Sequence, residues 1–485
     1  MKEPYDVRSA LRLLEEEEGQ LIYTDKETDA DCELAGVYRH IGAGGTVVRP
    51  TKIGPAMMFT NIKHHPGARI LIGLLGDRKR CARLLNTTSE QLPFMMNAAF
   101  AERKEPVKAA KGVCQEVVHL CDDPDFDIRR ILPAIKTTKE DAGPYITMGL
   151  CYASDLETKK SDVTIHRLCL QSKDELTMFF TPGIRHLDVF RKKAEEHGEA
   201  LPISISIGVD PAIEIAACFE PPTTPLGFNE LSIAGGIRKK PVELCKCVSI
   251  DEYAIAHSEY VIEGELLPGK RMAEDVHTGL GKAMPEFPGY CGEANPALPI
   301  IRVKAVTHRK NPIMRVCVGP GEEHVNLAGI PTEASILSLC EKAMPQKVRN
   351  VYCASSGGGK YIAVLQFIKR TASDEGRQRQ AALLAFSAFS ELKHVFLVDE
   401  DVDIYDMNDV LWAMTTRFQS DTDCISIPGV RCHPLDPSND PAYDPRIRDR
   451  GIACKTIFDC TVPFAQKHRF RRAAFQEVET AEWLK

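Results

Sequence analysis

Residues 282–293 read Lys-Ala-Met-Pro-Glu-Phe-Pro-Gly-Tyr-Cys-Gly-Glu and carry Glu286 between Pro285 and Pro288. Proline fixes the backbone angle φ and glycine relaxes it, so the pattern predicts a shaped loop rather than the interior of a helix or strand. An ionisable group on a stiff loop is suited to proton transfer. A lone glutamate in such a loop is more often a solvated surface residue, so its interpretation depends on the rest of the chain.

The contents of 44% hydrophobic and 27% charged side chains are those of a soluble globular protein. A chain of 485 residues is too long for one ordinary domain, so two or three domains are expected. A net charge of −7 and a pI near 6.1 argue against nucleic acid as the main partner. The apolar runs are short and the N-terminus is charged, so we expect no membrane span, no signal peptide and a cytoplasmic location. The 17 cysteines lack paired CxxC spacing, which predicts reduced thiols and argues against a zinc site.

An N-terminal α/β domain over residues 1–125 is predicted from alternating helical and strand patterns. Asp6 can cap a helix, residues 68–75 form a buried apolar strand, and residues 78–85 follow as a helix. The polar, turn-rich stretch 122–127 marks the end of this domain.

A β-rich central domain is expected over residues 126–330, because short strands with few long helices are typical of a barrel. The turn Lys310-Asn311-Pro312 predicts that the strand at 300–307 forms a hairpin with 313–318. The other strands are predicted at 163–170, 176–180, 203–207 and 261–265.

The C-terminal part, residues 331–485, returns to alternating strands and helices, which indicates a second α/β domain. The strands are predicted at 348–353, 361–367 and 395–398, and the helices at 376–391 and 408–417.

Asp162, His186 and Glu230 are candidate metal ligands. Asp162 lies at the start of a predicted strand, His186 ends a loop, and Glu230 follows the rigid loop 221–225, Pro-Pro-Thr-Thr-Pro. Two carboxylates and one imidazole suit Mn²⁺ or Mg²⁺ better than Zn²⁺. Their spacing along the chain does not show that they meet, so on the residues alone the absence of a metal remains the preferred interpretation.

Four segments together resemble one protein family. They are Asp-Val-Thr-Ile-His-Arg at 162–167, Asn-Glu-Leu-Ser-Ile-Ala-Gly at 229–235, Pro-Glu-Phe-Pro-Gly at 285–289, and Val-Asp-Glu-Asp-Val-Asp at 398–403 with the segment 408–417 behind it. These segments resemble the UbiD family of reversible decarboxylases, which use prenylated FMN, and the likeness covers nearly the whole chain. The stretches 38–45, 54–59 and 282–290 look closest to the family's protocatechuate and gallate decarboxylases.

The resemblance implies an α/β fold of several domains. It consists of an N-terminal α/β domain (1–125), a central split β-barrel that binds prenylated FMN (126–330) and a C-terminal α/β domain used in oligomerisation (331–485). A homo-oligomer, dimeric or hexameric, is therefore expected.

The resemblance also implies the cofactors. The phosphate of prenylated FMN would be held through a divalent cation, Mn²⁺ or Mg²⁺, with K⁺ nearby, and a flavin prenyltransferase would supply the flavin. By position, the metal ligands would be Asp162, His186 and Glu230, although the family often has Asn where this chain has Asp162. The flavin would contact Thr164, Ile165, His166, Pro182, Arg185, His186 and Glu230.

For catalysis, the resemblance implies that Arg167 and Glu286 form the proton-transfer pair. Loss of CO₂ from an arene leaves an electron pair that the ring cannot delocalise, so an electrophilic cofactor is needed. Glu286 would supply the replacing proton, and Arg167 would orient Glu286 and adjust its pKa. The family often has a second acid five residues on, where this chain has Cys291; Glu293 is the nearest acid.

His324, Lys360 and His433 each lie in a loop context, where the plain interpretation of any one is a surface residue. The resemblance implies that these positions face the hydroxyl groups of a catechol-type acid. A lysine or histidine there would stabilise a developing phenolate.

Two alternatives remain open. Another UbiD-type enzyme would act on a heteroaromatic or acrylic acid, but apolar residues at the hydroxyl-facing positions would then be expected. A flavin-binding maturation or carrier protein would lack turnover, and the intact pair of Arg167 and Glu286 argues against it. The preferred prediction is a carboxy-lyase that converts protocatechuate to catechol, gallate to pyrogallol, or both.

Overall fold

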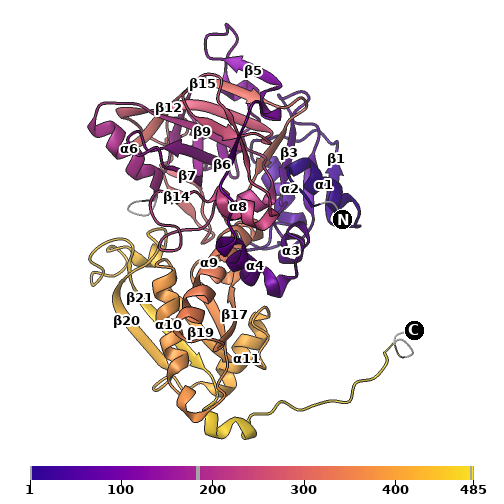
Figure 1. The fold of residues 1–485 in the computed structure, drawn as a ribbon, viewed down its shortest axis with the longest axis vertical. Helices are drawn as coiled ribbons and strands as arrows, with labels where there is room; N and C mark the ends of the chain where they lie inside the picture. The colour runs from indigo at the N-terminus through magenta and orange to yellow at the C-terminus, as the bar shows by residue number, and fades with distance from the viewer. Residues whose placement is uncertain (1–2, 182–185, 481–482, 484–485) are drawn as a thin grey trace.

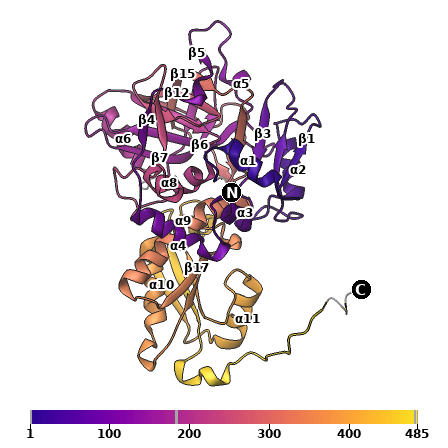
Figure 2. The same cartoon turned by 45° about the vertical axis from the view of Figure 1, so that its right-hand side comes forward.

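The computed structural model describes residues 3–181, 186–480 and 483. These residues form two lobes that meet around helix α9 (Glu322–Ala343), as Figures 1 and 2 show. The upper lobe in Figure 1 contains the N-terminal and central elements, and the lower lobe contains the C-terminal sheet. The predicted α/β architecture with several domains is confirmed.

The N-terminal part is built on a four-stranded sheet in the order β1-β2-β3-β16. Its first helix is capped as predicted, because the Asp6 carboxylate accepts a hydrogen bond from the backbone N–H of Ser9 at 2.8 Å. The elements are α1 (Val7–Glu15), β1 (Leu21–Thr24), α2 (Glu33–Ile41), β2 (Ala56–Phe59), β3 (Arg69–Ile72), α3 (Arg78–Leu84) and α4 (Leu92–Ala101).

The central part is a barrel. Strands follow the order β12-β9-β6-β7-β8-β15, and the additional pairing of β12 with β15 closes the ring. The strands are β4 (Val107–Ala109), β5 (Val117–Leu120), β6 (Tyr145–Ser154), β7 (Ser161–Leu170), β8 (Glu175–Met178), β9 (Leu201–Ile207), β10 (Glu243–Lys246), β11 (Tyr253–Ile255), β12 (Tyr260–Met272), β13 (Lys282–Pro285), β14 (Cys291–Glu293), β15 (Leu298–His308) and β16 (Ile313–Val316). The helices are α5 (Ile128–Ile131), α6 (His186–Glu196), α7 (Pro211–Ala216) and α8 (Leu231–Arg238).

The predicted hairpin between β15 and β16 is wrong. Both edges of β15 are occupied, by β12 on one side and by β8 and β5 on the other. β16 instead joins the N-terminal sheet, parallel to β3, where Ile313 lies opposite Arg69. All four residues of β16 are buried, which fits parallel pairing inside the protein better than a half-solvated hairpin.

The C-terminal lobe is a five-stranded sheet in the order β17-β18-β19-β21-β20, flanked by helices. Its elements are β17 (Val348–Cys353), β18 (Ile362–Phe367), α10 (Arg377–Ala388), β19 (His394–Asp399), α11 (Met407–Arg417), β20 (Cys424–Arg431) and β21 (Ile452–Cys460). The long helix α9 precedes them, and the expected boundary near residue 330 falls inside it. Within the described residues, no helix combines the length and the apolar character that crossing a membrane requires.

Candidate active site

A cavity lies where the barrel, the β13–β14 hairpin, the start of α9 and the C-terminal lobe meet. Glu286 occupies the turn of this hairpin, as the predicted shaped loop requires, but the two ends of that stretch, residues 282–285 and 291–293, are strands rather than loop. The cavity is lined by residues from all four of these parts: Ile165, His166, Arg167, Phe179, Met284, Glu286, Phe287, His324, Lys360, His433 and Leu435.

Arg167, on β7, contacts two carboxylates, those of Glu286 and Glu274. It forms an ion pair with Glu286 through one terminal nitrogen. Its Nε and other terminal nitrogen each donate to Glu274, both at 3.0 Å. The guanidinium carbon also lies 4.1 Å from the centre of the Phe179 ring. Two parallel hydrogen bonds and a stacked ring fix the guanidinium group, so its remaining nitrogen is aimed at Glu286.

Glu274 is the second carboxylate of the site, and the sequence analysis missed it. It is 1% exposed and also accepts hydrogen bonds from the Tyr145 hydroxyl and the Asn295 backbone N–H, both at 3.0 Å. The residues considered for this role lie elsewhere: Cys291 contacts Glu140, and Glu293 pairs with Arg450 at the rim. In the sequence, Glu274 is simply an acidic residue shortly after the segment that forms β12. Its spacing along the chain does not predict contact with Arg167.

Asp162, His186 and Glu230 come together, with one ligand atom from each lying within 4.8 Å of the others. Asp162 lies near the start of β7, His186 begins α6, and Glu230 precedes α8. Burial raises the pKa of Glu230 well above its usual value, and the neighbouring carboxylate of Asp162 raises it further. Two buried carboxylates beside an imidazole are therefore suited to a hard divalent cation, which would relieve this repulsion.

The predicted flavin contacts cluster on β7. Ile165 and His166 line this cavity, and Thr164 lines an adjoining pocket together with Ile165. Nδ1 of His166 lies 2.9 Å from the backbone oxygen of Phe179. The Thr164 hydroxyl donates to Asp162 at 3.1 Å, which connects this strand to the metal-ligand cluster. Of the other predicted contacts, His186 and Glu230 belong to the metal-ligand cluster, and Pro182 and Arg185 lie outside the described residues.

His324, Lys360 and His433 lie around one aromatic ring, that of Phe287. The His324 ring stacks on Phe287 with centres 5.6 Å apart, and the His433 ring meets its edge at 4.7 Å. The Lys360 ammonium nitrogen lies 5.7 Å from the same ring centre. Glu286, the candidate proton donor, directly precedes Phe287. It lines the same cavity as the three predicted hydroxyl-facing side chains.

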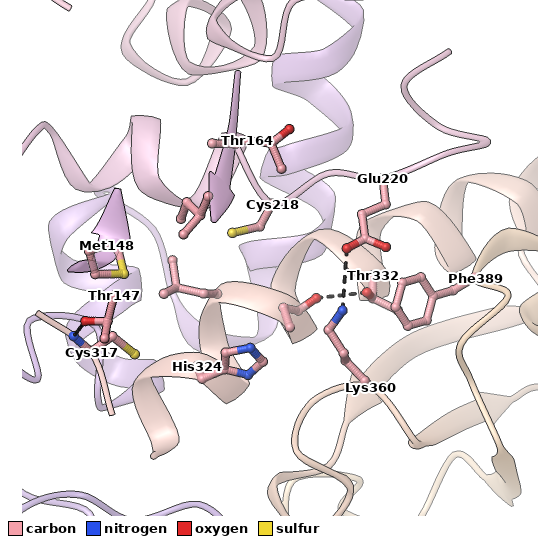
Figure 3. Close-up of a pocket in the computed structure, with 14 residues that line it drawn as sticks. Thr147, Met148, Thr164, Cys218, Glu220, Cys317, His324, Thr332, Lys360 and Phe389 are labelled. Carbon is pink, nitrogen blue, oxygen red and sulfur yellow. Dashed lines mark hydrogen bonds and ion pairs between the residues drawn. The ribbon is translucent and has the colours of Figure 1, made fainter. Parts of the chain in front are cut away.

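Lys360 is buried against two carboxylates that the sequence analysis did not identify. Its Nζ lies 2.7 Å from Glu391 and 3.4 Å from Glu220. Figure 3 shows Lys360 pointing toward Glu220, with His324 beside it in the first turn of α9 rather than in the predicted loop. A buried ammonium group needs such partners, because burial without countercharge disfavours the charged form.

Three family models match the chain in succession. The N-terminal domain of 3-octaprenyl-4-hydroxybenzoate carboxy-lyase matches residues 12–99, its Rift-related domain matches 105–323 and its C-terminal domain matches 325–460. The fold, a closed barrel between two α/β parts that carries an Arg–carboxylate pair, is thus the fold of a carboxy-lyase. The chain belongs to the UbiD family of decarboxylases.

Individual relatives agree with this assignment. Gallate decarboxylase of Lactiplantibacillus plantarum is 52% identical over 487 residues, which cover 100% of this chain and 99% of the relative. The apo structure of a 3,4-dihydroxybenzoic acid decarboxylase from Enterobacter cloacae is 56% identical, with a TM-score of 0.95 over 100% of this chain and 99% of that one. An evolved dimeric form of the UbiD-class enzyme HmfF from Pelotomaculum thermopropionicum, in complex with prenylated FMN, is 30% identical, with a TM-score of 0.84 over 99% and 100%.

Proposed function

We propose that this protein is a prenylated-FMN-dependent decarboxylase of a catechol-type benzoic acid. Its substrates are 3,4-dihydroxybenzoate, gallate or both, and its products are catechol, pyrogallol and CO₂. The observation that carries the proposal is one cavity that contains the Arg167–Glu286 pair together with Lys360, His324 and His433. The identities of 52% and 56% to enzymes named for these substrates support the choice of substrate.

The chain's own residues would perform the binding and the proton transfer. When bound, prenylated FMN supplies an electrophilic carbon that accepts the electron pair released as CO₂ leaves. Glu286 delivers a proton to the ring carbon that carried the carboxylate, and Arg167 holds Glu286 in the direction of that carbon. Lys360, His324 and His433 favour ionisation of the phenolic hydroxyl by stabilising its negative charge, and a phenolate donates electrons toward that carbon more strongly than a neutral hydroxyl does.

The cofactor is held on the barrel side of the cavity in this proposal. Thr164, Ile165 and His166 would contact the flavin, with Pro182 and Arg185 completing its site. Asp162, His186 and Glu230 would bind Mn²⁺ or Mg²⁺ beside the flavin phosphate, where a cation offsets the charges of phosphate and carboxylates, with K⁺ nearby. The buried position of Asp162 and Glu230, 1% and 2% exposed, supports a cation there.

The remaining parts of the proposal concern partners. A flavin prenyltransferase would supply the modified flavin, and the protein would work in the cytoplasm as a homodimer or homohexamer assembled through the C-terminal lobe. Residues 1–125, 126–330 and 331–485 remain the proposed domains.

The test is turnover of protein that was co-expressed with a flavin prenyltransferase. Release of catechol from 3,4-dihydroxybenzoate, or of pyrogallol from gallate, together with CO₂ is the expected result. Protein made without the prenyltransferase should be inactive. A preference for cinnamate or for a furan carboxylate over both hydroxylated acids would contradict the proposal.

A further inference from the structure

Glu391 lies behind the cavity, in the short loop between α10 and β19. It is 2% exposed, and it does not line the cavity itself. The backbone on both sides of it is fixed, because the Lys455 ammonium group donates to the carbonyl of Ser390 at 2.8 Å and to that of Leu392 at 2.6 Å. The Cys432 thiol also donates to the Glu391 carbonyl at 3.3 Å. The Glu391 side chain therefore projects from a rigid base.

One oxygen of Glu391 faces two of the residues around Phe287. Its Oε2 lies 2.7 Å from Nζ of Lys360 and 3.5 Å from Nε2 of His433. A single carboxylate oxygen thus approaches a cation and an imidazole that come from different segments of the C-terminal lobe. The ammonium group of Lys360 and Nε2 of His433 are consequently held beside the same carboxylate oxygen.

The hydrogen bonds of His433 define its protonation state. The backbone N–H of Leu435 donates to Nδ1 of His433 at 3.0 Å, so Nδ1 acts as an acceptor. A neutral imidazole carries its single proton on the other nitrogen, and the N–H of His433 is therefore at Nε2, the atom that faces Glu391. Lys360 is the charged member of the pair, and Glu391 is its shorter carboxylate contact.

We propose that Glu391 is a positioning residue that holds Lys360 as an ammonium ion, so that an N–H group of Lys360 not directed at Glu391 recognises an oxygen of a catecholate. The inference rests on the proposed function and deepens it, because it names a carboxylate that acts on substrate recognition through Lys360 without touching the substrate. Removal of Glu391 takes away the 2.7 Å carboxylate contact of Lys360, and a buried ammonium group that loses a countercharge releases its proton more readily.

The experiment measures binding of 4-nitrocatechol, a catechol whose absorbance changes when its hydroxyl ionises, to the holoenzyme. Wild type should bind the probe in its ionised form. Glu391→Gln keeps the shape and removes the charge, and it should weaken binding by about tenfold or more and reduce the ionised fraction of bound probe. Glu391→Asp keeps the charge and should retain more of both properties than Glu391→Gln.

The matched control is Glu375→Gln. Glu375 pairs with another buried lysine of the same lobe, Lys369, at 2.7 Å, and it does not line the cavity. This variant should bind the probe as wild type does. Melting temperature and flavin content, measured on every variant, separate loss of fold from loss of recognition.

A double-mutant cycle with Lys360→Met tests whether Glu391 acts through Lys360. The double variant Glu391→Gln/Lys360→Met should bind the probe about as weakly as Lys360→Met alone. Full additivity of the two losses, unaltered binding by Glu391→Gln, or a wild type that does not bind the probe would each overturn the inference. A wild type that binds ionised probe in a Glu391-dependent way but decarboxylates neither acid would refute the proposed function and leave the inference standing.

Discussion

Replacement of Glu286 by glutamine removes the acidic proton and leaves the shape of the side chain nearly unchanged. The structure indicates that the surroundings would tolerate this change. Arg167 would keep both hydrogen bonds to Glu274. Gly292 packs closely against the side chain of Glu286, since a Cβ added to Gly292 would stand 3.1 Å from Cγ of Glu286, and this packing does not depend on the charge. The amide should therefore occupy the position of the carboxylate, and the loss should be confined to proton donation.

The size of the loss follows from that role. General acid–base catalysis contributes about 10²–10⁴-fold, which corresponds to about 3–5 kcal/mol of activation free energy. Glu286→Gln should lower kcat on 3,4-dihydroxybenzoate within this range. Flavin and metal contents should match those of wild type.

Two assays measure the effect. Steady-state release of catechol gives kcat, and exchange of deuterium from solvent into the ring of catechol follows the same proton in the reverse direction. Both rates should fall together in Glu286→Gln. A variant whose kcat stays within about tenfold of wild type, below the range for general acid–base catalysis, would refute the assignment of Glu286 as proton donor.

Further predictions concern the neighbours of this pair, the metal site, the substrate and the stability of the fold. Glu274→Gln should release the guanidinium of Arg167 and lower kcat by up to about 100-fold at unchanged flavin content, because small misplacements of a reacting group are costly; an unchanged kcat would show that Glu274 has no part in catalysis. Glu230→Ala should lose metal and flavin together in metal analysis and absorbance spectra, and wild-type contents of both would count against the site. Lys360→Met should reduce kcat/KM for 3,4-dihydroxybenzoate by about 2–4 kcal/mol of transition-state free energy without loss of flavin, and wild type should be poor on 3-hydroxybenzoate; equal rates on the two acids would contradict the catechol assignment. Burial lowers the pKa of His394 to about 4, so between pH 6.5 and 4 the unfolded chain binds a proton that the folded chain does not, and stability should fall as the pH is lowered through this window. Urea unfolding at pH 7 and pH 5 should show a smaller loss for His394→Gln than for wild type, and an equal loss would show that His394 does not contribute.

Local patterns predicted the local elements well. The apolar pattern at 163–170 predicted β7, and Asp6 predicted the start of α1, because strand period and helix capping depend on neighbours in the chain. The turn around Glu286 was predicted for the same reason. Pairing across the chain was harder to predict. The turn before β16 was visible in the sequence, but the occupied edges of β15, which prevent a hairpin, depend on strands tens of residues away.

The candidate site shows the same division. Arg167 and Glu286 came from the family resemblance, whereas Glu274 was missed because its partner lies 107 residues earlier in the chain. Glu391 was missed because it was predicted as the last residue of a helix over 376–391, although α10 ends at Ala388, and only burial beside Lys360 distinguishes it from a surface glutamate. The three candidate metal ligands could be named from the sequence, but their mutual distance depends on how β7, α6 and α8 pack.

The position of β16 at the edge of the N-terminal sheet has a consequence for synthesis of the chain. β1, β2 and β3 are complete once residue 72 has been made, but the fourth strand ends at Val316. During synthesis, the edge of β3 that pairs with β16 therefore stays unpaired while more than two hundred further residues are added. Unpaired strand edges invite pairing with other chains, and contacts between distant segments form slowly. Newborn chains of this enzyme should accordingly depend on chaperones until the barrel has been translated, and fragments that end before residue 313 should aggregate.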